Sequence, residues 1–101
     1  MAKLYITEFT SAANHGDIGG LVPMAQLPPV KTQVVTISSA SAQSVEISQS
    51  TRLVRIHSDT ICHVLAEDNP TATTNDMRLA PDQTEYFGIR SGQKIAVIQG
   101  S

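Results

Sequence analysis

The most constraining feature of the sequence is a series of short runs rich in Val, Ile and Thr, each ended by Gly, Pro, Asn, Asp or Ser. These turn signals recur at intervals of about 8–12 residues, a spacing typical of antiparallel sandwiches and barrels. No window places apolar residues at the i, i+3, i+4 and i+7 positions of a three-turn helix. Because parallel strands need long, usually helical crossovers, we expect an all-β fold of antiparallel strands.

About eight short strands are expected from this pattern. The first covers Leu4–Phe9, and the others are placed over residues 33–38, 44–48, 52–58, 61–67, 77–80, 85–89 and 94–99. Alternation within 44–48 puts Val45 and Ile47 on one face, and turns are predicted at Pro81-Asp82 and Ser91-Gly92. The sequence therefore predicts one domain over residues 1–101, a small antiparallel β-sandwich for which a jelly roll is one of the allowed strand orders.

Residues 10–29 stand apart from the strand pattern, and we expect them to form an irregular arm or long loop. The sandwich core is then formed by residues 30–99 and by a strand over 3–9. The segment is rich in Gly and Pro, but a phosphate-binding loop would also need a Lys and a following helix. Because a loop this long in a small domain usually has a function, the segment is predicted to contact another subunit.

One hairpin can be predicted in detail over residues 53–66. If Asp59-Thr60 is a two-residue turn, His57 pairs with Cys62 across the two strands. The core face then carries Val54, Ile56, Ile61, His63 and Leu65. The other face carries Leu53, Arg55, His57, Cys62, Val64 and Ala66, a mixture that suits burial against another subunit. A three-residue turn would exchange the faces of one strand.

His57, Cys62 and His63 are close in sequence, and such residues can form a metal site or a cysteine–histidine nucleophile pair. In the register above, however, His63 points to the face opposite His57, so the three side chains do not converge. Cys62 is interpreted as a small buried side chain and the two histidines as hydrogen-bonded structural residues. A single cysteine also excludes an internal disulfide.

Four carboxylates, those of Asp59, Glu67, Asp68 and Asp82, could in principle act in pairs as general acid and general base. Asp59 and Asp82 stand where turns favour aspartate, because its side chain can accept hydrogen bonds from nearby backbone amides. Glu67 and Asp68 are interpreted as a strand end followed by a turn. The sequence therefore predicts no catalytic residue, no cofactor site and no metal site.

The charge and composition of the chain exclude some classes of binding partner. Charged residues make up 16% of the chain and the net charge is −2, so direct nucleic-acid binding is not expected. Glu8 interrupts the first apolar run, and no run reaches the length of a membrane helix, so neither a signal peptide nor a membrane partner is predicted.

Tyr86 and Phe87 must point to opposite faces of their strand, one into the core and the other as a candidate interface anchor.

Five segments together resemble a small protein found in tailed-bacteriophage genomes, where it is encoded among the virion structural genes near the major capsid protein. They are M-A-K-L-Y-I-T-E-F (1–9), T-R-L-V-R-I-H-S-D-T-I-C (51–62), N-P-T-A-T (69–73), R-L-A-P-D-Q-T-E-Y-F-G-I (78–89) and G-Q-K-I-A-V-I (92–98). The resemblance covers both ends of the chain and little of residues 10–50, and it contains no catalytic motif.

This resemblance implies a non-enzymatic capsid decoration (cement) protein, assembled in the host cytoplasm and located on the outer capsid surface of the virion. Its implied partners are the major capsid protein and further copies of itself, as a dimer or trimer. The expected contacts lie in the arm, in the 69–76 loop and on the mixed face: His15, Asp17, Leu21, Val22, Met24, Leu27, Arg55, His57, Val64, Thr73 and Tyr86.

Three other functions remain open. The chain could be a head–tail joining or tail component of the same virion. It could be a soluble carbohydrate-binding module, although the aromatic content of 4% offers few stacking platforms. A small hydrolase or metalloenzyme using His57, Cys62 and His63 has the least support.

Overall fold

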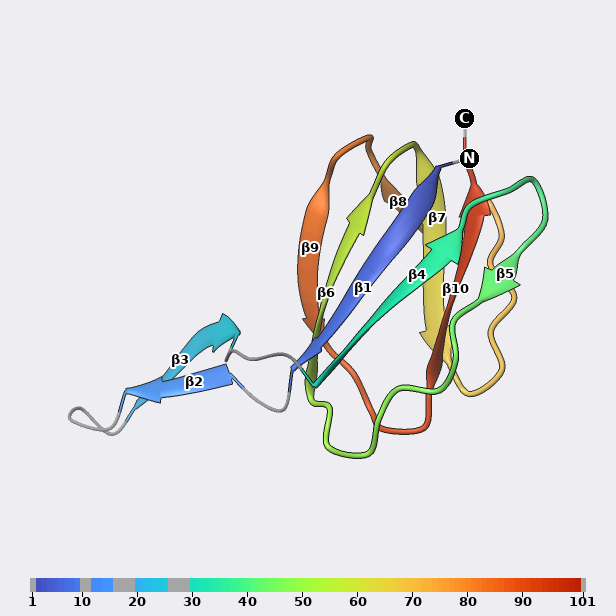
Figure 1. The fold of residues 1–101 in the computed structure, drawn as a ribbon. Coiled ribbons are helices and arrows are strands. Elements are labelled where there is room, and N and C mark those ends of the chain that lie inside the picture. Colours follow the sequence, from blue (N-terminus) through green and yellow to red (C-terminus); the bar gives the residue numbers. More distant parts are fainter. Residues whose placement is uncertain (1, 10–11, 16–19, 26–29, 101) are drawn as a thin grey trace.

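The structure is a computed structural model that describes residues 2–9, 12–15, 20–25 and 30–100. Within these ranges it contains ten β-strands and no helix (Figure 1), and therefore no helix that could cross a membrane. The strands are β1 (Lys3–Phe9), β2 (Ala12–His15), β3 (Gly20–Ala25), β4 (Lys31–Thr36), β5 (Ala42–Gln43), β6 (Leu53–Ser58), β7 (Cys62–Glu67), β8 (Met77–Leu79), β9 (Thr84–Gly88) and β10 (Lys94–Gln99).

Eight of these strands form a β-sandwich, as the sequence predicts. The first sheet has the order β4-β1-β6-β9 and the second sheet the order β5-β10-β7-β8. Every described pairing within the two sheets is antiparallel. The two sheets face each other in Figure 1, with the apolar core between them.

The strand order is that of a jelly roll whose last strand has moved to the start of the chain. If the eight sandwich strands are renumbered from β4 as the first strand to β1 as the eighth, the two sheets have the orders 1-8-3-6 and 2-7-4-5. This is the strand order of a jelly roll, which contains two Greek keys. The chain ends lie side by side in Figure 1, as this rearrangement requires. At that end Ile37 N–H donates to Ala2 O at 2.9 Å, and Gln99 N–H donates to Ser38 O at 2.9 Å.

The core is built from the inward-facing residues of both sheets. In β6 the predicted alternation is confirmed, since Val54 and Ile56 are fully buried while Leu53 and Arg55 are partly exposed. β-Branched side chains dominate because they pack well on a pleated surface. The core residues are Leu4, Ile6, Val35, Ile37, Ile47, Val54, Ile56, Cys62, Val64, Leu79, Ile89, Ile95 and Val97.

The predicted hairpin between residues 53 and 66 is wrong. β6 and β7 lie in different sheets: β6 pairs with β1 and β9, and β7 pairs with β10 and β8. The short connection from Asp59 to Ile61 crosses between the sheets, so His57 and Cys62 are not cross-strand partners. The faces of β7 are consequently exchanged, with Cys62 and Val64 in the core instead of His63. Sequence neighbours were assumed to pair, whereas a jelly roll pairs strands that are distant in sequence.

The strand predicted over residues 44–48 is also wrong in extent and in its faces. Only Ala42–Gln43 is a strand, and Val45 is 57% exposed while Ile47 is 2% exposed. The backbone here bonds partly to side chains, because Val45 N–H donates to Gln33 Oε1 at 3.0 Å. Ile47 N–H donates to Gln93 O at 2.8 Å. A segment held in this way does not keep the two-residue alternation of a pleated strand.

The segment between β1 and β4 is not an irregular arm where the structure describes it. β2 and β3 form an antiparallel hairpin with Asn14 opposite Leu21, and its register shifts between Ala12 and Asn14. In Figure 1 this hairpin projects from the end of the sandwich at which β1 finishes and β4 begins. Residues 10–11, 16–19 and 26–29 lie outside the described residues.

Two predicted turns are confirmed. Gln83 N–H donates to Ala80 O at 3.2 Å across Pro81-Asp82, and Asp82 has a φ of 60°. Across Ser91-Gly92 the φ of Gly92 is 83°. A positive φ at the third turn position is the signature of a type II turn, which favours Gly or a short polar residue there.

Candidate interaction surface

The outer face of the first sheet brings together exposed aromatic, apolar and basic side chains. Alternation turns Leu53, Arg55 and His57 of β6 outward, and the register sets Tyr5 beside His57 and Tyr86 beside Arg55. We call this surface the tyrosine face. Its members are Tyr5, Val34, Leu53, Arg55, His57 and Tyr86.

Two exposed tyrosines are the largest side chains of the tyrosine face. Tyr5 is 38% exposed and Tyr86 is 54% exposed, and the two lie on either side of β6, which separates their strands by about 10 Å. The rings of Tyr5 and His57 have centroids 6.4 Å apart. Arg55 supplies the one full charge among the six members. Tyr and Arg are the residue types that most often anchor protein interfaces, so this face has the chemistry of a docking surface.

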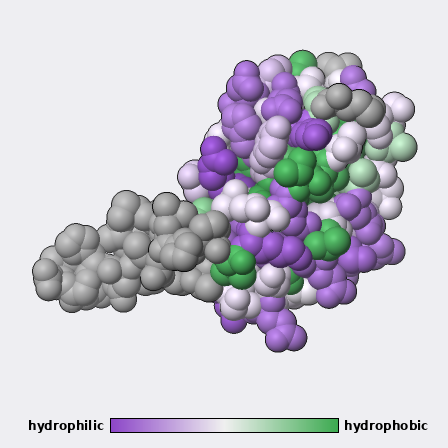
Figure 2. All heavy atoms as spheres, viewed as in Figure 1, coloured by the Kyte–Doolittle hydropathy of each residue, from purple (hydrophilic) through white to green (hydrophobic). Residues whose placement is uncertain are grey.

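Figure 2 shows how hydrophobic residues are distributed over one side of the described part of the molecule. On the side seen in Figure 2 they form small groups among polar residues instead of one continuous patch. Such a mixed surface is typical of non-obligate interfaces, whose average polarity is close to that of the remaining surface.

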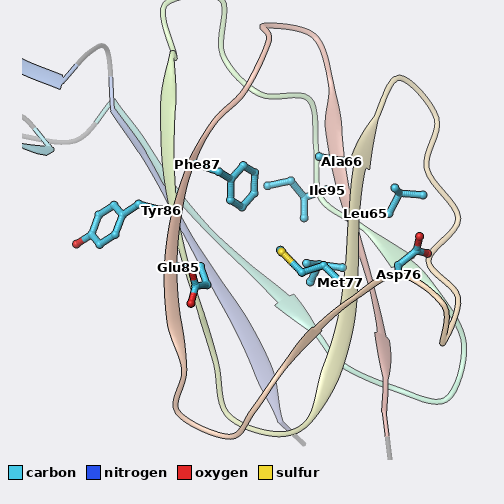
Figure 3. Close-up of a pocket in the computed structure, with 9 residues that line it drawn as sticks. Leu65, Ala66, Asp76, Met77, Glu85, Tyr86, Phe87 and Ile95 are labelled. Atoms are coloured by element: carbon cyan, nitrogen blue, oxygen red, sulfur yellow. The ribbon is translucent and has the colours of Figure 1, made fainter. Parts of the chain in front are cut away.

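The structure brings together three of the interface residues predicted from sequence: Arg55, His57 and Tyr86. Val64 does not belong with them, because it is 4% exposed and part of the core. Phe87 points inward behind Tyr86, as predicted for one member of that pair (Figure 3). Tyr5 was missed by the sequence interpretation, although Leu4 and Ile6 on the core face already imply that Tyr5 faces outward.

The remaining predicted contacts lie elsewhere. Thr73 is exposed in a tight turn, where its N–H donates to Asp76 Oδ2 at 2.7 Å. The arm residues His15, Leu21, Val22 and Met24 lie in the hairpin of β2 and β3. Asp17 and Leu27 lie outside the described residues.

A second feature, at the edge of the tyrosine face, is a cluster of possible metal ligands. One ligand atom from each of His57, Asp59 and Asp82 lies within 4.8 Å of the others. His57 Nε2 is 3.8 Å from Asp82 Oδ1, and His57 Nδ1 is 2.7 Å from the Thr84 hydroxyl. Both aspartates were predicted as turn residues. Asp59 follows His57 by two residues in the sequence, whereas the proximity of Asp82 to His57 depends on the order of the strands.

The side chains of His57, Cys62 and His63, considered together from the sequence, do not converge. His57 belongs to the first sheet, whereas Cys62 points into the core and His63 Nδ1 lies 3.0 Å from Asp76 O. Burial raises the pKa of the Cys62 thiol, against a smaller lowering by the Ser58 side chain. A buried thiol with a raised pKa is a poor nucleophile.

A pocket of about 320 Å³ opens between the edges of the two sheets (Figure 3). Phe87 of the first sheet and Ile95 of the second point into the space between the sheets, and Tyr86 points away from it. Two carboxylates at the pocket are engaged locally: Glu85 Oε2 accepts a hydrogen bond from Gln83 Nε2 at 2.7 Å, and Asp76 caps its own turn. The lining residues are Val64, Leu65, Ala66, Asp76, Met77, Glu85, Tyr86, Phe87 and Ile95.

Glu8 is fully buried at the end of the sandwich from which the hairpin projects. Its carboxylate accepts hydrogen bonds from Gln33 Nε2 at 2.9 Å, Ser48 N–H at 2.9 Å and Thr51 Oγ1 at 2.8 Å. Burial acts to raise the pKa of Glu8, but these hydrogen bonds outweigh it and hold the pKa below its ordinary value. Glu8 is therefore an ionised structural residue that ties three segments together.

No family model, curated protein or solved structure matches the chain.

Proposed function

We propose that this chain is a non-enzymatic structural protein of a phage virion that binds the outer capsid shell as a decoration protein. The tyrosine face is the observation that carries the docking part of the proposal. The phage setting rests on the five sequence segments that resemble small virion proteins. The major capsid protein is the proposed partner of the face.

The composition of the tyrosine face supports a docking role. Tyr5 and Tyr86 offer large rigid side chains whose burial costs little conformational entropy, and each keeps a hydroxyl for hydrogen bonding. Arg55 lies opposite Tyr86, on the strand that separates Tyr86 from Tyr5, and can pair with a carboxylate of the partner. A face of this size gives modest affinity by itself, but contacts repeated over many copies on a shell add through avidity.

The β2–β3 hairpin supports the same proposal. A two-stranded hairpin is marginally stable alone in water and gains stability by packing against something else. The sequence of β3, G-L-V-P-M-A, has no charged residue. We propose that the hairpin packs on a neighbouring subunit, either the capsid protein or another copy of this chain in a dimer or trimer.

Counting copies of the chain in purified virions tests the proposal. Quantitative mass spectrometry against the major capsid protein should give a ratio near one, or a simple fraction of it. About a dozen copies per particle would instead place the chain at the head–tail joint or tail. Absence from the virion would overturn the structural role altogether.

Carbohydrate binding is a second candidate, because Tyr5 and Tyr86 present exposed rings on one face of a sheet. Sugar rings stack on such aromatic platforms. Screening the purified chain on a glycan array separates the two functions, since a decoration protein should give no hit, whereas a hit lost in Tyr86→Ala would favour the carbohydrate module.

A further inference from the structure

We propose that His57, Asp59 and Asp82 form a binding site for a divalent transition-metal ion of the zinc type. The site lies at the edge of the tyrosine face, where the end of β6, the β6–β7 connection and the β8–β9 turn meet. The inference goes beyond the proposed function and does not depend on it.

The geometry of the three side chains suits one ion. Metal–ligand bonds of about 2.0–2.2 Å in a tetrahedral zinc site place ligand atoms about 3.4 Å apart. His57 Nε2 and Asp82 Oδ1 are 3.8 Å apart, and an atom of Asp59 completes a triangle with sides no longer than 4.8 Å. Side-chain rotations that shorten the sides of this triangle by at most about 1.4 Å would bring the three ligand atoms to bonding distance.

The histidine is oriented for this role by a residue outside the cluster. The Thr84 hydroxyl lies 2.7 Å from Nδ1 of His57, so it can accept the Nδ1 proton and leave Nε2 as the nitrogen with a free lone pair. Nε2 is the atom that faces Asp82. A metal-binding histidine typically donates its other ring N–H to such a neighbour, which fixes both the tautomer and the ring orientation.

The backbone around the two aspartates is also fixed. Asp59 N–H donates to Lys3 O at 3.1 Å, and Lys3 N–H donates to Asp59 Oδ2 at 3.1 Å, so β1 holds this residue at two points. Asp82 N–H donates to Ser58 O at 2.8 Å. His57 and Asp59 are two residues apart in the sequence, and these contacts hold Asp82, 23 positions after Asp59, near both of them before any ion binds. This arrangement lowers the conformational cost of binding.

The ligand types select the class of ion. An imidazole nitrogen favours Zn²⁺, Ni²⁺, Cu²⁺ or Co²⁺ over Mg²⁺ and Ca²⁺, which prefer oxygen ligands. Three protein ligands leave at least one coordination position open. Because Asp59 and Asp82 are exposed, that position faces solvent and can be filled by water.

Isothermal titration of the purified chain with ZnCl₂, and the visible absorbance of its Co²⁺ form, test the proposal. We expect one ion per chain, with His57→Ala and Asp82→Asn each weakening the affinity at least tenfold. Thr84→Val should weaken it about 10–100-fold, because Thr84 positions His57 without touching the ion. His15→Ala and Glu67→Gln are matched controls that remove a histidine and a carboxylate outside the cluster, and both should bind as the unchanged chain does.

Histidine NMR signals of the unchanged chain identify the ligand directly, so this test does not depend on a variant that could fail to fold. Zn²⁺ should shift the ring signals of His57 and leave those of His63 in place. An alternative role for the cluster is a simple ion pair between protonated His57 and the aspartates. Failure to bind Zn²⁺ in stoichiometric amount, or equal affinity in His57→Ala, would overturn the metal site in favour of that ion pair.

Discussion

The hydroxyl of Thr51 donates a hydrogen bond of 2.8 Å to Oε1 of Glu8, and neither residue is exposed to solvent. This contact ties β1 to the segment that leads into β6, 43 positions away in the sequence. A buried carboxylate is costly unless each of its oxygens is hydrogen-bonded. Both oxygens of Glu8 accept such bonds, so this residue closes the end of the sandwich beside the hairpin.

Glu8 should therefore be among the most sensitive positions of the chain. Glu8→Ala removes the acceptor of hydrogen bonds from Gln33, Ser48 and Thr51. We therefore expect a loss of about 3 kcal/mol in the free energy of unfolding. Urea denaturation measures it. Glu46→Gln, which changes an exposed carboxylate, should alter the free energy of unfolding by no more than about 0.5 kcal/mol. Equal effects of the two substitutions on the free energy of unfolding would contradict a structural role for Glu8.

Stability should also fall in acid because of Glu8. Its pKa is lower in the folded chain than its ordinary value of 4.5, so the folded state favours the ionised form. The resulting stabilisation is fully present above pH 4.5 and is lost as the pH falls through the lower pKa of the folded state. Urea midpoints measured from about pH 7 to about pH 3 should therefore decline more steeply for the unchanged chain than for Glu8→Gln. Parallel curves would contradict this assignment.

Cys62 should be protected from thiol reagents in the folded protein. The side chain is fully buried in the core, and burial raises the pKa of its thiol. Reaction with a disulfide reagent should be slow for native protein and fast in denaturant, since the thiolate is the reactive form. Ser91→Cys, which places a thiol at an exposed turn, serves as the comparison. Equal rates at the two positions in native protein would show that Cys62 is accessible.

The first strand and the central strands of the sandwich could be predicted from sequence because their alternation is regular. Lys94–Gln99 is a strand with the predicted bounds, and Val54 and Ile56 face the core as expected. The strand order could not be derived in the same way. A short link at Asp59 fits either a hairpin or a crossing between sheets, and the choice depends on strands far away in the sequence.

The candidate site was predicted only in part for the same reason. Arg55 and His57 share a face because they are two residues apart on one strand, and alternation alone shows this. Their proximity to Tyr5 and Asp82 comes from the pairing of β6 with β1 and from the β8–β9 turn. Val64 was placed on the same surface because β6 and β7 were assumed to pair.

The hairpin should be dispensable for folding but not for docking. Glu8 pairs with Lys31, and Val30 N–H donates to Glu8 O at 2.7 Å, so the described residues that flank the 10–29 segment already lie together. Replacing 10–29 by Asn-Gly should join β1 and β4 in a two-residue hairpin turn. We expect the free energy of unfolding to change by no more than about 1 kcal/mol, while the amount of chain bound to capsids decreases. Full capsid occupancy by the shortened chain would exclude the hairpin as a contact.

The most direct test of the docking surface is co-sedimentation of the purified chain with shells assembled from the major capsid protein alone. Arg55→Glu reverses the charge at the centre of the tyrosine face, and Arg78→Glu makes the same change on β8 of the second sheet, where the residue is exposed. We expect the unchanged chain and Arg78→Glu to sediment with shells, and Arg55→Glu to remain in the supernatant. Equal binding of the two variants, or no binding of the unchanged chain, would contradict docking through this face.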